Sequence, residues 1–213
     1  TPFNQDIGNW NVSAVTNMSS MFRNSSFNQY IGDWNVSKVI GMSYMFYSAT
    51  TFNQDIGNWN VSAVTNMRYM FRYATNFNQN IGNWNVGNVT NMVYMFANIK
   101  FNKDIGNWNV SKVTNMSNMF YNASNFNQDI GNWNVSNVTN MAQTFRLAQS
   151  FNQDIGNWNV SAVTNMSSMF RNSSFNQDIG SWNVSKVTNM DAMFFSATNF
   201  NQDLSGWCVE NIT

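Results

Sequence analysis

The chain has 213 residues, with 10 basic and 10 acidic side chains and no histidine. A formal net charge of zero argues against binding to nucleic acid or to anionic membranes, because both need a basic excess. Without histidine there is no Ser-His-Asp relay and no histidine-ligated metal, and the single Cys208 permits neither an internal disulfide nor a thiolate zinc site. We therefore expect no catalytic residue, no cofactor and no metal. No apolar run is long enough to predict direct membrane insertion.

One motif, F-N-Q-D-I-G-N-W-N-V-S-x-V-T-N-M-x-x-M-F, recurs from end to end. A regular period of 24 or 25 residues is typical of a solenoid, in which each unit is too small to bury its own apolar face. Because neither a linker nor a change of composition interrupts the repeats, we expect a single repeat domain over residues 1–213. Eight full coils begin at Phe3, Phe27, Phe52, Phe77, Phe101, Phe126, Phe151 and Phe175, and a partial terminal coil begins at Phe200.

The periodicity changes within each repeat. Trp10-Asn11-Val12 alternates apolar and polar residues, which is the signal of a strand. Val15, Met18 and Phe22 follow at three- and four-residue steps, which indicate a helix or a 3₁₀ turn. One short parallel strand and one short helical or 3₁₀ turn in each coil of 24–25 residues predict an α/β fold class and a right-handed solenoid.

Three repeat positions carry further structural expectations. Gly8 suits a tight bend before the strand. The asparagine of F-N-Q, from Asn4 to Asn201, is expected to form a buried ladder that satisfies backbone groups between coils. The aspartate shared by most coils, such as Asp104 and Asp129, is expected to accept hydrogen bonds from turn N–H groups; calcium bound between coils is the alternative.

The aromatic and methionine positions are expected to face the core. Trp10 and Val12 share strand parity, which predicts that the 9 tryptophans are buried rather than forming a stripe on which sugar rings stack. The 15 methionines keep step with valine and phenylalanine, which favours core packing over a methionine-lined binding surface.

The repeat resembles that of BspA-type leucine-rich-repeat bacterial surface proteins. More closely, it resembles the tandem W-x-V-S-x-V-T-x-M-x-x-M-F unit of Listeria, mycoplasma and marine bacterial surface lipoproteins. The matching residues in one repeat are Val15-Thr16-Asn17-Met18, Met21-Phe22, Phe27-Asn28-Gln29, Ile31-Gly32 and Trp34-Asn35-Val36-Ser37. The resemblance implies a leucine-rich-repeat-like solenoid on a secreted or surface-anchored protein that is often tied to adhesion. It transfers no catalytic residue.

Two faces are candidate binding sites. If tryptophan and valine point inward, the intervening asparagines form an outward polar row on the expected sheet face, able to bond hydroxyl-rich ligands; a merely solvated face is the alternative. The candidate ligand-binding residues of that row are Asn35, Asn60, Asn85, Asn109, Asn134 and Asn159. The alternative site is the expected convex face, where the copies differ most, with Arg68, Tyr69, Arg72, Tyr73 and Arg146.

These features predict a non-enzymatic recognition, adhesion or scaffold module that is extracellular or on a cell surface and binds a protein or polysaccharide partner there. The alternative is a structural stalk or filament subunit that self-associates through the solenoid ends, because uncapped ends are sticky. The chain starts at Thr1 with no signal peptide or lipid-anchor motif, so we expect part of a longer or processed protein. Cys208 is expected either as a free thiol or in an intermolecular disulfide.

Overall fold

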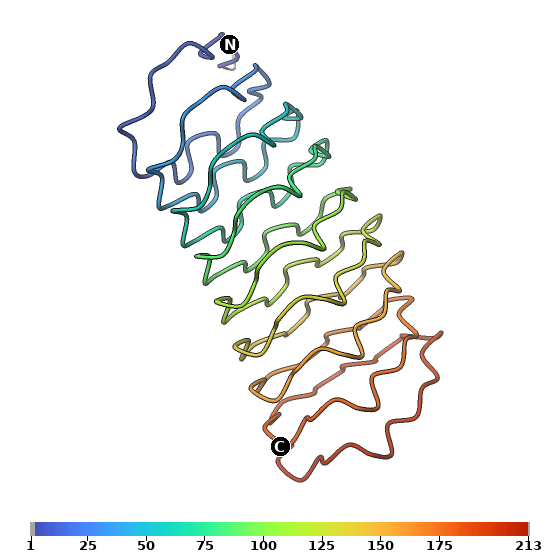
Figure 1. Cartoon of the computed structure of the whole chain (residues 1–213). Helices are drawn as coiled ribbons and strands as arrows, with labels where there is room; N and C mark the ends of the chain where they lie inside the picture. The colour runs from blue at the N-terminus through green and yellow to red at the C-terminus, as the bar shows by residue number, and fades with distance from the viewer. Residues whose placement is uncertain (1–2, 213) are drawn as a thin grey trace.

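Successive repeats stack as coils of a solenoid in the computed structural model, which describes residues 3–212. Figure 1 shows the two termini at opposite ends of the stack, with the coils following one another in chain order. Backbone hydrogen bonds between neighbouring coils join residues 24 or 25 positions apart, as the sequence period predicts. The expected solenoid is therefore confirmed.

The backbone ladder between coils lies at the V-T-N-M segment and not at Trp-Asn-Val. Seven isolated parallel bridges join the asparagine of this segment, or Gly41 in its place, from Asn17 to Asn189. Either side of each bridge, hydrogen bonds cross the coil boundary, as from the amide of Thr90 to the carbonyl of Thr65 at 2.9 Å. These bridges are single residues, and the described chain contains no longer strand.

The strand expected at Trp10-Asn11-Val12 and its equivalents is wrong, although the predicted alternation of buried and exposed side chains is present. A turn closes on each side of the segment, as the bonds from Trp34 N to Ile31 O and from Val39 N to Val36 O show in the second coil. Among the described residues, no backbone hydrogen bond joins one Trp-Asn-Val segment to the equivalent segment of the next coil.

The expected helical turn is wrong as well, because the segment consists of β-turns. In the first coil, the amide of Met21 bonds the carbonyl of Met18, and the amide of Ser25 bonds the carbonyl of Phe22. The third residue of each turn has a positive φ, 62° at Ser20 and 56° at Asn24. That geometry defines type II turns and excludes a right-handed helix. The α/β class is therefore wrong for residues 3–212, which hold no helix.

Alternate amides of the turn segment also bond the next coil. Ser20 N donates to Ser43 O at 2.9 Å, and Phe22 N donates to Met45 O at 2.9 Å. The paired turns therefore act as a ladder of their own, and they form one continuous face of the solenoid from residue 18 to residue 197. We call this the turn face.

The core consists of the apolar residues that recur in every coil. In the second coil, Val39, Met42 and Phe46 have no exposed surface, and Trp34 is 3% exposed. Phenylalanine rings stack from coil to coil, as between Phe46 and Phe71, whose centroids lie 5.6 Å apart. The predicted burial is confirmed for the internal tryptophans and methionines, but it is wrong for the first coil, where Trp10 is 54% and Met21 is 39% exposed.

Side chains also tie each coil to the next. Eight hydrogen bonds of 2.8–3.0 Å run from the amide of a F-N-Q asparagine to the Oδ1 of the same asparagine one coil earlier. The predicted asparagine ladder is therefore confirmed, but it is not buried. Asn28 and Asn102 are half-buried, whereas Asn53 and Asn78 are exposed, because the ladder runs along an outer corner of each coil.

The recurrent glycine lies in a tight bend before the tryptophan, as expected, since Trp10 N donates to Ile7 O at 3.0 Å around Gly8, but its backbone angles are not what requires glycine. No glycine in residues 3–212 has a positive φ. Instead, a Cβ at Gly57 would lie 2.5 Å from the carbonyl oxygen of Asn80, and a Cβ at Gly106 would lie 2.6 Å from that of Asp129. Glycine is required because the backbone of the next coil approaches too closely for any side chain.

In residues 3–212, no helix is long and apolar enough to cross a membrane.

Candidate interaction face

The asparagine row occupies an exposed position, as predicted, but on a segment of turns rather than on a sheet. Each asparagine Oδ1 accepts a hydrogen bond from the amide two residues later, as Asn109 does from Ser111 at 3.1 Å. Within the described residues the Nδ2 group of Asn109 donates no hydrogen bond. The row therefore offers neutral N–H donors at a uniform spacing. All six predicted members, Asn35, Asn60, Asn85, Asn109, Asn134 and Asn159, are exposed.

The turn face differs from the asparagine row because aromatic and cationic residues gather on its first four coils. We call this cluster the Tyr–Arg patch. Its members come from the turn segments of consecutive coils, which bring residues distant in sequence side by side. They are Arg23, Tyr44, Tyr47, Arg68, Tyr69, Arg72, Tyr73 and Tyr94.

Three tyrosines from consecutive coils stack in the patch. The ring centroids of Tyr44 and Tyr69 lie 4.5 Å apart, with 6° between the planes. Those of Tyr69 and Tyr94 lie 4.9 Å apart, at 19°. Beside this stack, Tyr47 and Tyr73 meet edge to face, with centroids 5.8 Å apart. The hydroxyl groups of Tyr44, Tyr47, Tyr69 and Tyr94 make no hydrogen bond to another described residue. The hydroxyl of Tyr73 accepts one from Arg72.

Arg72 lies at the centre of the patch. Its guanidinium carbon is 4.2 Å from the ring centroid of Tyr94, 4.8 Å from that of Tyr73 and 5.5 Å from that of Tyr69. Its Nη2 donates a hydrogen bond of 3.2 Å to the hydroxyl of Tyr73, whereas its Nε is buried without a partner. Cation–π contacts of this kind hold the guanidinium in a fixed orientation.

The other arginines of the patch also contact rings instead of carboxylates. Arg23 lies 5.2 Å from the ring centroid of Tyr44 and 5.1 Å from that of Tyr47, and Arg68 lies 5.4 Å from that of Tyr44. Neither arginine forms an ion pair with any residue in 3–212. The patch therefore keeps an uncompensated positive charge.

The stacked tyrosines occupy a backbone conformation that disfavours them. Tyr44, Tyr69 and Tyr94 have φ values of 59°, 61° and 56°, in the left-handed region. For a bulky residue this conformation is uncommon and costs roughly 1–2 kcal/mol, while asparagine tolerates it well. Asn118 and Ser168 occupy the same repeat position in later coils. The turn geometry therefore does not require tyrosine there.

The phenol of Tyr69 is held in its neutral form. Partial burial is the largest cause that raises its pKa above the ordinary value, and the neighbouring phenols of Tyr44 and Tyr94 raise it further. The guanidinium groups of Arg72 and Arg68 oppose this effect. Because the pKa is raised, the Tyr69 hydroxyl remains a proton donor at neutral and mildly alkaline pH.

A smaller group of the same kind lies further along the turn face. Arg146 lies 5.5 Å from the ring centroid of Tyr121, and Arg171 lies 4.6 Å from that of Phe195. Arg146 also donates a hydrogen bond to Gln143 at 2.9 Å. Arg146, a predicted site residue, contacts no residue of the Tyr–Arg patch directly; Tyr121 joins the two groups through an edge contact with Tyr94, with centroids 6.4 Å apart. The patch does bring together the other four predicted residues of this face, Arg68, Tyr69, Arg72 and Tyr73.

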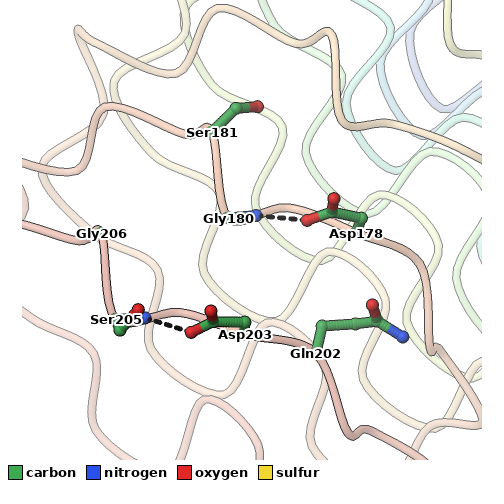
Figure 2. A pocket seen from close by; sticks show the side chains of 7 residues that line it. All are labelled: Asp178, Gly180, Ser181, Gln202, Asp203, Ser205 and Gly206. Atoms are coloured by element: carbon green, nitrogen blue, oxygen red, sulfur yellow. Dashed lines mark hydrogen bonds between the residues drawn. The ribbon is translucent and has the colours of Figure 1, made fainter.

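A polar hollow of about 410 Å³ lies at another corner of the last coils, where Asp178 and Asp203 line it (Figure 2). Asp178 Oδ1 accepts a hydrogen bond from Gly180 N at 2.8 Å, and Asp203 Oδ1 accepts one from Ser205 N at 2.9 Å. The predicted hydrogen bonds from turn N–H groups to the aspartates are thereby confirmed. Bonds from the Ser205 amide and side chain lower the pKa of Asp203.

Neither metal-ligand clusters nor other cysteines appear in the described part of the chain. No group of three or more histidine, cysteine or carboxylate side chains there is arranged to hold a metal ion. Cys208 is an exposed free thiol. The calcium alternative for the aspartate row gains no support from this geometry.

The sequence predicted four site residues of the patch but not the other four, Arg23, Tyr44, Tyr47 and Tyr94, as their partners. The signal was available, because Tyr44, Tyr69 and Tyr94 are spaced 25 residues apart, which is one coil. What hid it was the assumption of a helical turn. Side-chain directions differ between a helix and successive type II turns, so the expected neighbours were not the observed ones.

The stacked coils define the chain as a tandem-repeat solenoid protein, with aromatic residues repeating every 24 or 25 positions. It belongs to the family described as Mycoplasma protein of unknown function, DUF285, whose model matches residues 1–104 and again residues 92–207. No curated protein and no solved structure matches the chain.

Proposed function

We propose that the chain is a non-enzymatic recognition module at a cell surface, and that it binds its partner through the Tyr–Arg patch. The observation that carries this proposal is the placement of three stacked tyrosines, Tyr44, Tyr69 and Tyr94, at left-handed positions that do not need them. The same left-handed position recurs in all eight full coils and holds serine, asparagine, glutamine or alanine elsewhere, so the fold alone does not select tyrosine there.

The composition of the patch supports binding to a macromolecule. Tyrosine and arginine are among the residues that most often dominate the energy of protein interfaces, because they combine a large contact area with specific polar groups. Here stacking and cation–π contacts fix the rings and guanidinium groups before any partner arrives. Such pre-organisation lowers the entropy cost of binding.

The likeness of the repeat to leucine-rich-repeat surface proteins and surface lipoproteins supports an extracellular or cell-surface location. A ladder of parallel bridges, one to each coil, accords with that likeness. The right-handed coil that the likeness implies is part of the same proposal.

The asparagine row stays an alternative site for the same function. It offers one free amide group in each coil, which suits a repetitive neutral ligand such as an uncharged polysaccharide. Every member, however, uses its oxygen in a local turn, and the members differ only in a second local bond, from a serine hydroxyl, that Asn35 and Asn60 accept. The row lacks the local differences that would define one binding site.

The two sites are distinguished by measuring attachment of the purified chain to a panel of immobilised matrix proteins and polysaccharides. We expect Tyr44→Ser, Tyr69→Ser and Tyr94→Ser together to abolish attachment. Serine already occupies this position at φ 62° in Ser20 and 54° in Ser168, so the turns should still form.

The matched variant changes the asparagine row, with Asn85→Glu, Asn109→Glu and Asn134→Glu together. We expect it to attach like the unaltered chain. Loss of attachment with the glutamate variant alone, persisting as salt is raised, would instead place the site on the asparagine row, because bonds from neutral amides do not depend on the Debye length.

End-to-end assembly is a second candidate. In internal coils the tryptophan is covered by the neighbouring coil, and a second copy that continued the stack would make the same contact. Light scattering that rises with protein concentration would support assembly, and its absence in Trp10→Ser would place the contact at the coil of Trp10.

A further inference from the structure

The arginines of the chain are distributed unevenly over the solenoid. All five, Arg23, Arg68, Arg72, Arg146 and Arg171, belong to turn-face segments, and each lies against an aromatic ring. None forms an ion pair with another described residue. In the Tyr–Arg patch itself there is no carboxylate, because the acidic residue of the turn face is Asp191, in the eighth coil. A chain with zero net charge therefore carries a locally positive surface.

The aromatic rings of the patch add to the positive character of its surface. The faces of Tyr69 pack against Tyr44 and Tyr94, and the face of Tyr94 also meets Arg72. A ring face is the negative part of an aromatic side chain, and its edge is positive. Because the faces are used inside the patch, edges and unbonded hydroxyl groups are left for a partner.

This arrangement selects against two kinds of ligand. A cationic group needs an open ring face, and a neutral sugar that stacks on tyrosine also needs one. Two guanidinium groups lie over the ring of Tyr44, that of Arg23 at 5.2 Å and that of Arg68 at 5.4 Å from the centroid. A partner that carries negative charge meets guanidinium groups, hydroxyl donors and ring edges, all of which attract it.

We propose that the Tyr–Arg patch binds an acidic segment of another protein, whose carboxylates pair with Arg23, Arg68 and Arg72 and whose backbone or side chains accept hydrogen bonds from the tyrosine hydroxyl groups. This inference rests on the proposed recognition function and specifies the partner's chemistry. The planar guanidinium group matches a carboxylate with two parallel hydrogen bonds, which favours a carboxylate-bearing ligand.

A polypeptide fits the patch better than a charged polysaccharide does. A polymer with a regular charge repeat would be matched by the same residue in every coil. Arginine stands at the position of Arg72 in only four coils, as Arg23, Arg72, Arg146 and Arg171, and the two coils that flank Arg72 carry Tyr47 and Ala97 instead. The stack of tyrosines also ends at Tyr94, since Asn118 follows at that position. A local, irregular set of tyrosine and arginine is typical of a protein interface.

The test measures binding of a short fluorescent polyglutamate peptide to the whole chain by anisotropy, with an uncharged glycine–serine peptide of equal length as the reference. We expect polyglutamate alone to bind, and its affinity to fall steeply with salt, because the Debye length shrinks from about 10 Å at 0.1 M to about 3 Å at 1 M. The combined variant Arg23→Gln, Arg68→Gln and Arg72→Gln should weaken binding by about tenfold or more.

The matched control removes three positive charges elsewhere, with Lys38→Gln, Lys112→Gln and Lys186→Gln together. These lysines are exposed and lie outside the turn face, so binding should be nearly unchanged. An equal loss in both triple variants would overturn the inference, because binding would then depend only on net charge. Circular dichroism and denaturation of both variants would show that each is folded.

Other outcomes also decide the question. Tighter binding of a sulfated polysaccharide such as heparin, or of single-stranded DNA, than of polyglutamate would overturn the choice of an acidic protein segment. No binding of polyglutamate would overturn the inference as well. If the tyrosine-to-serine variant still lost attachment to the immobilised panel in that case, the proposed function would stand with a partner of different chemistry.

Discussion

The indole Nε1 of Trp108 donates a hydrogen bond of 3.1 Å to the carbonyl oxygen of Ile81, one coil earlier in the chain. Eight such bonds, each 3.0–3.1 Å long, link consecutive coils from Trp34 to Trp207. The tryptophan is thus a core side chain that also makes a hydrogen bond across the boundary between two coils. Because a solenoid is stabilised by interfaces between neighbouring repeats, this bond contributes directly to the cooperativity of folding.

We expect Trp108→Phe to lower the free energy of unfolding by about 1–3 kcal/mol, since it removes a buried hydrogen bond and leaves space where the larger ring was. The measurement is chemical denaturation followed by circular dichroism. Trp10→Phe is the control: Trp10 is 54% exposed, so its change should cost little. Equal losses for the two variants would contradict the role given to the indole bond.

Phe96→Ala should cost about 3–5 kcal/mol, the range for a cavity left by a buried phenylalanine. Phe96 has no exposed surface, and its ring lies between those of Phe71 and Phe120, at 6.0 Å and 5.8 Å. Asn83→Ser should cost little, because Asn83 is exposed and Ser181 already occupies its position in the eighth coil. Urea or guanidinium denaturation of both variants checks this contrast, which would be absent if Phe96 faced solvent.

Gly106→Ala should destabilise the chain by about 1–3 kcal/mol, because the added Cβ forces neighbouring backbone to move. The Cβ would lie 2.6 Å from the carbonyl oxygen of Asp129. Gly206→Ala is the control, since the nearest atom to its Cβ is the carbonyl oxygen of Gly180, at an ordinary 3.7 Å. Thermal unfolding compares the two; a stable Gly106→Ala would show that the coils can separate easily.

The sequence predicted the solenoid and its core because both depend only on the repeat length and on which positions are apolar. It did not predict the turn segment, because Met18, Met21 and Phe22 have the same spacing in a helix and in two type II turns. The difference lies in the sign of φ at Ser20 and Asn24, and neither residue is a glycine that would have marked a left-handed position.

The same ambiguity limited the prediction of the binding face. Arg68, Tyr69, Arg72 and Tyr73 stood out because they vary between copies, but variation does not show which side chains meet. The contact of Arg72 with Tyr94 joins two coils, and it depends on the direction in which each turn projects its side chain. Only the three-dimensional structure supplies that direction.

The phenol of Tyr69 should ionise at a higher pH than an ordinary tyrosine, because partial burial and the adjacent phenols raise its pKa. In the unfolded chain the same group ionises first, at its ordinary pKa. Its contribution to stability is therefore complete below that value and is lost as the pH rises through the pKa of the folded state. Ultraviolet titration of the unaltered chain and of Tyr69→Phe isolates this phenol. Ionisation at the ordinary pH of tyrosine would contradict the packing described for the stack.

Replacing the stacked tyrosines with asparagine should change stability much less than it changes binding. Each replacement relieves left-handed strain of roughly 1–2 kcal/mol, because asparagine adopts that conformation readily. It also removes a ring–ring contact worth about 0.5–1.5 kcal/mol. The two effects oppose each other, so we expect Tyr69→Asn to shift the free energy of unfolding by no more than about 1 kcal/mol. Asn118, at the same position two coils later with a φ of 60°, shows that the turn accommodates the residue.

Denaturation and attachment to the immobilised panel should be measured on one preparation. A large loss of stability would mean that the tyrosines are retained for folding, whereas unchanged stability with lost attachment would mean that they are retained for recognition.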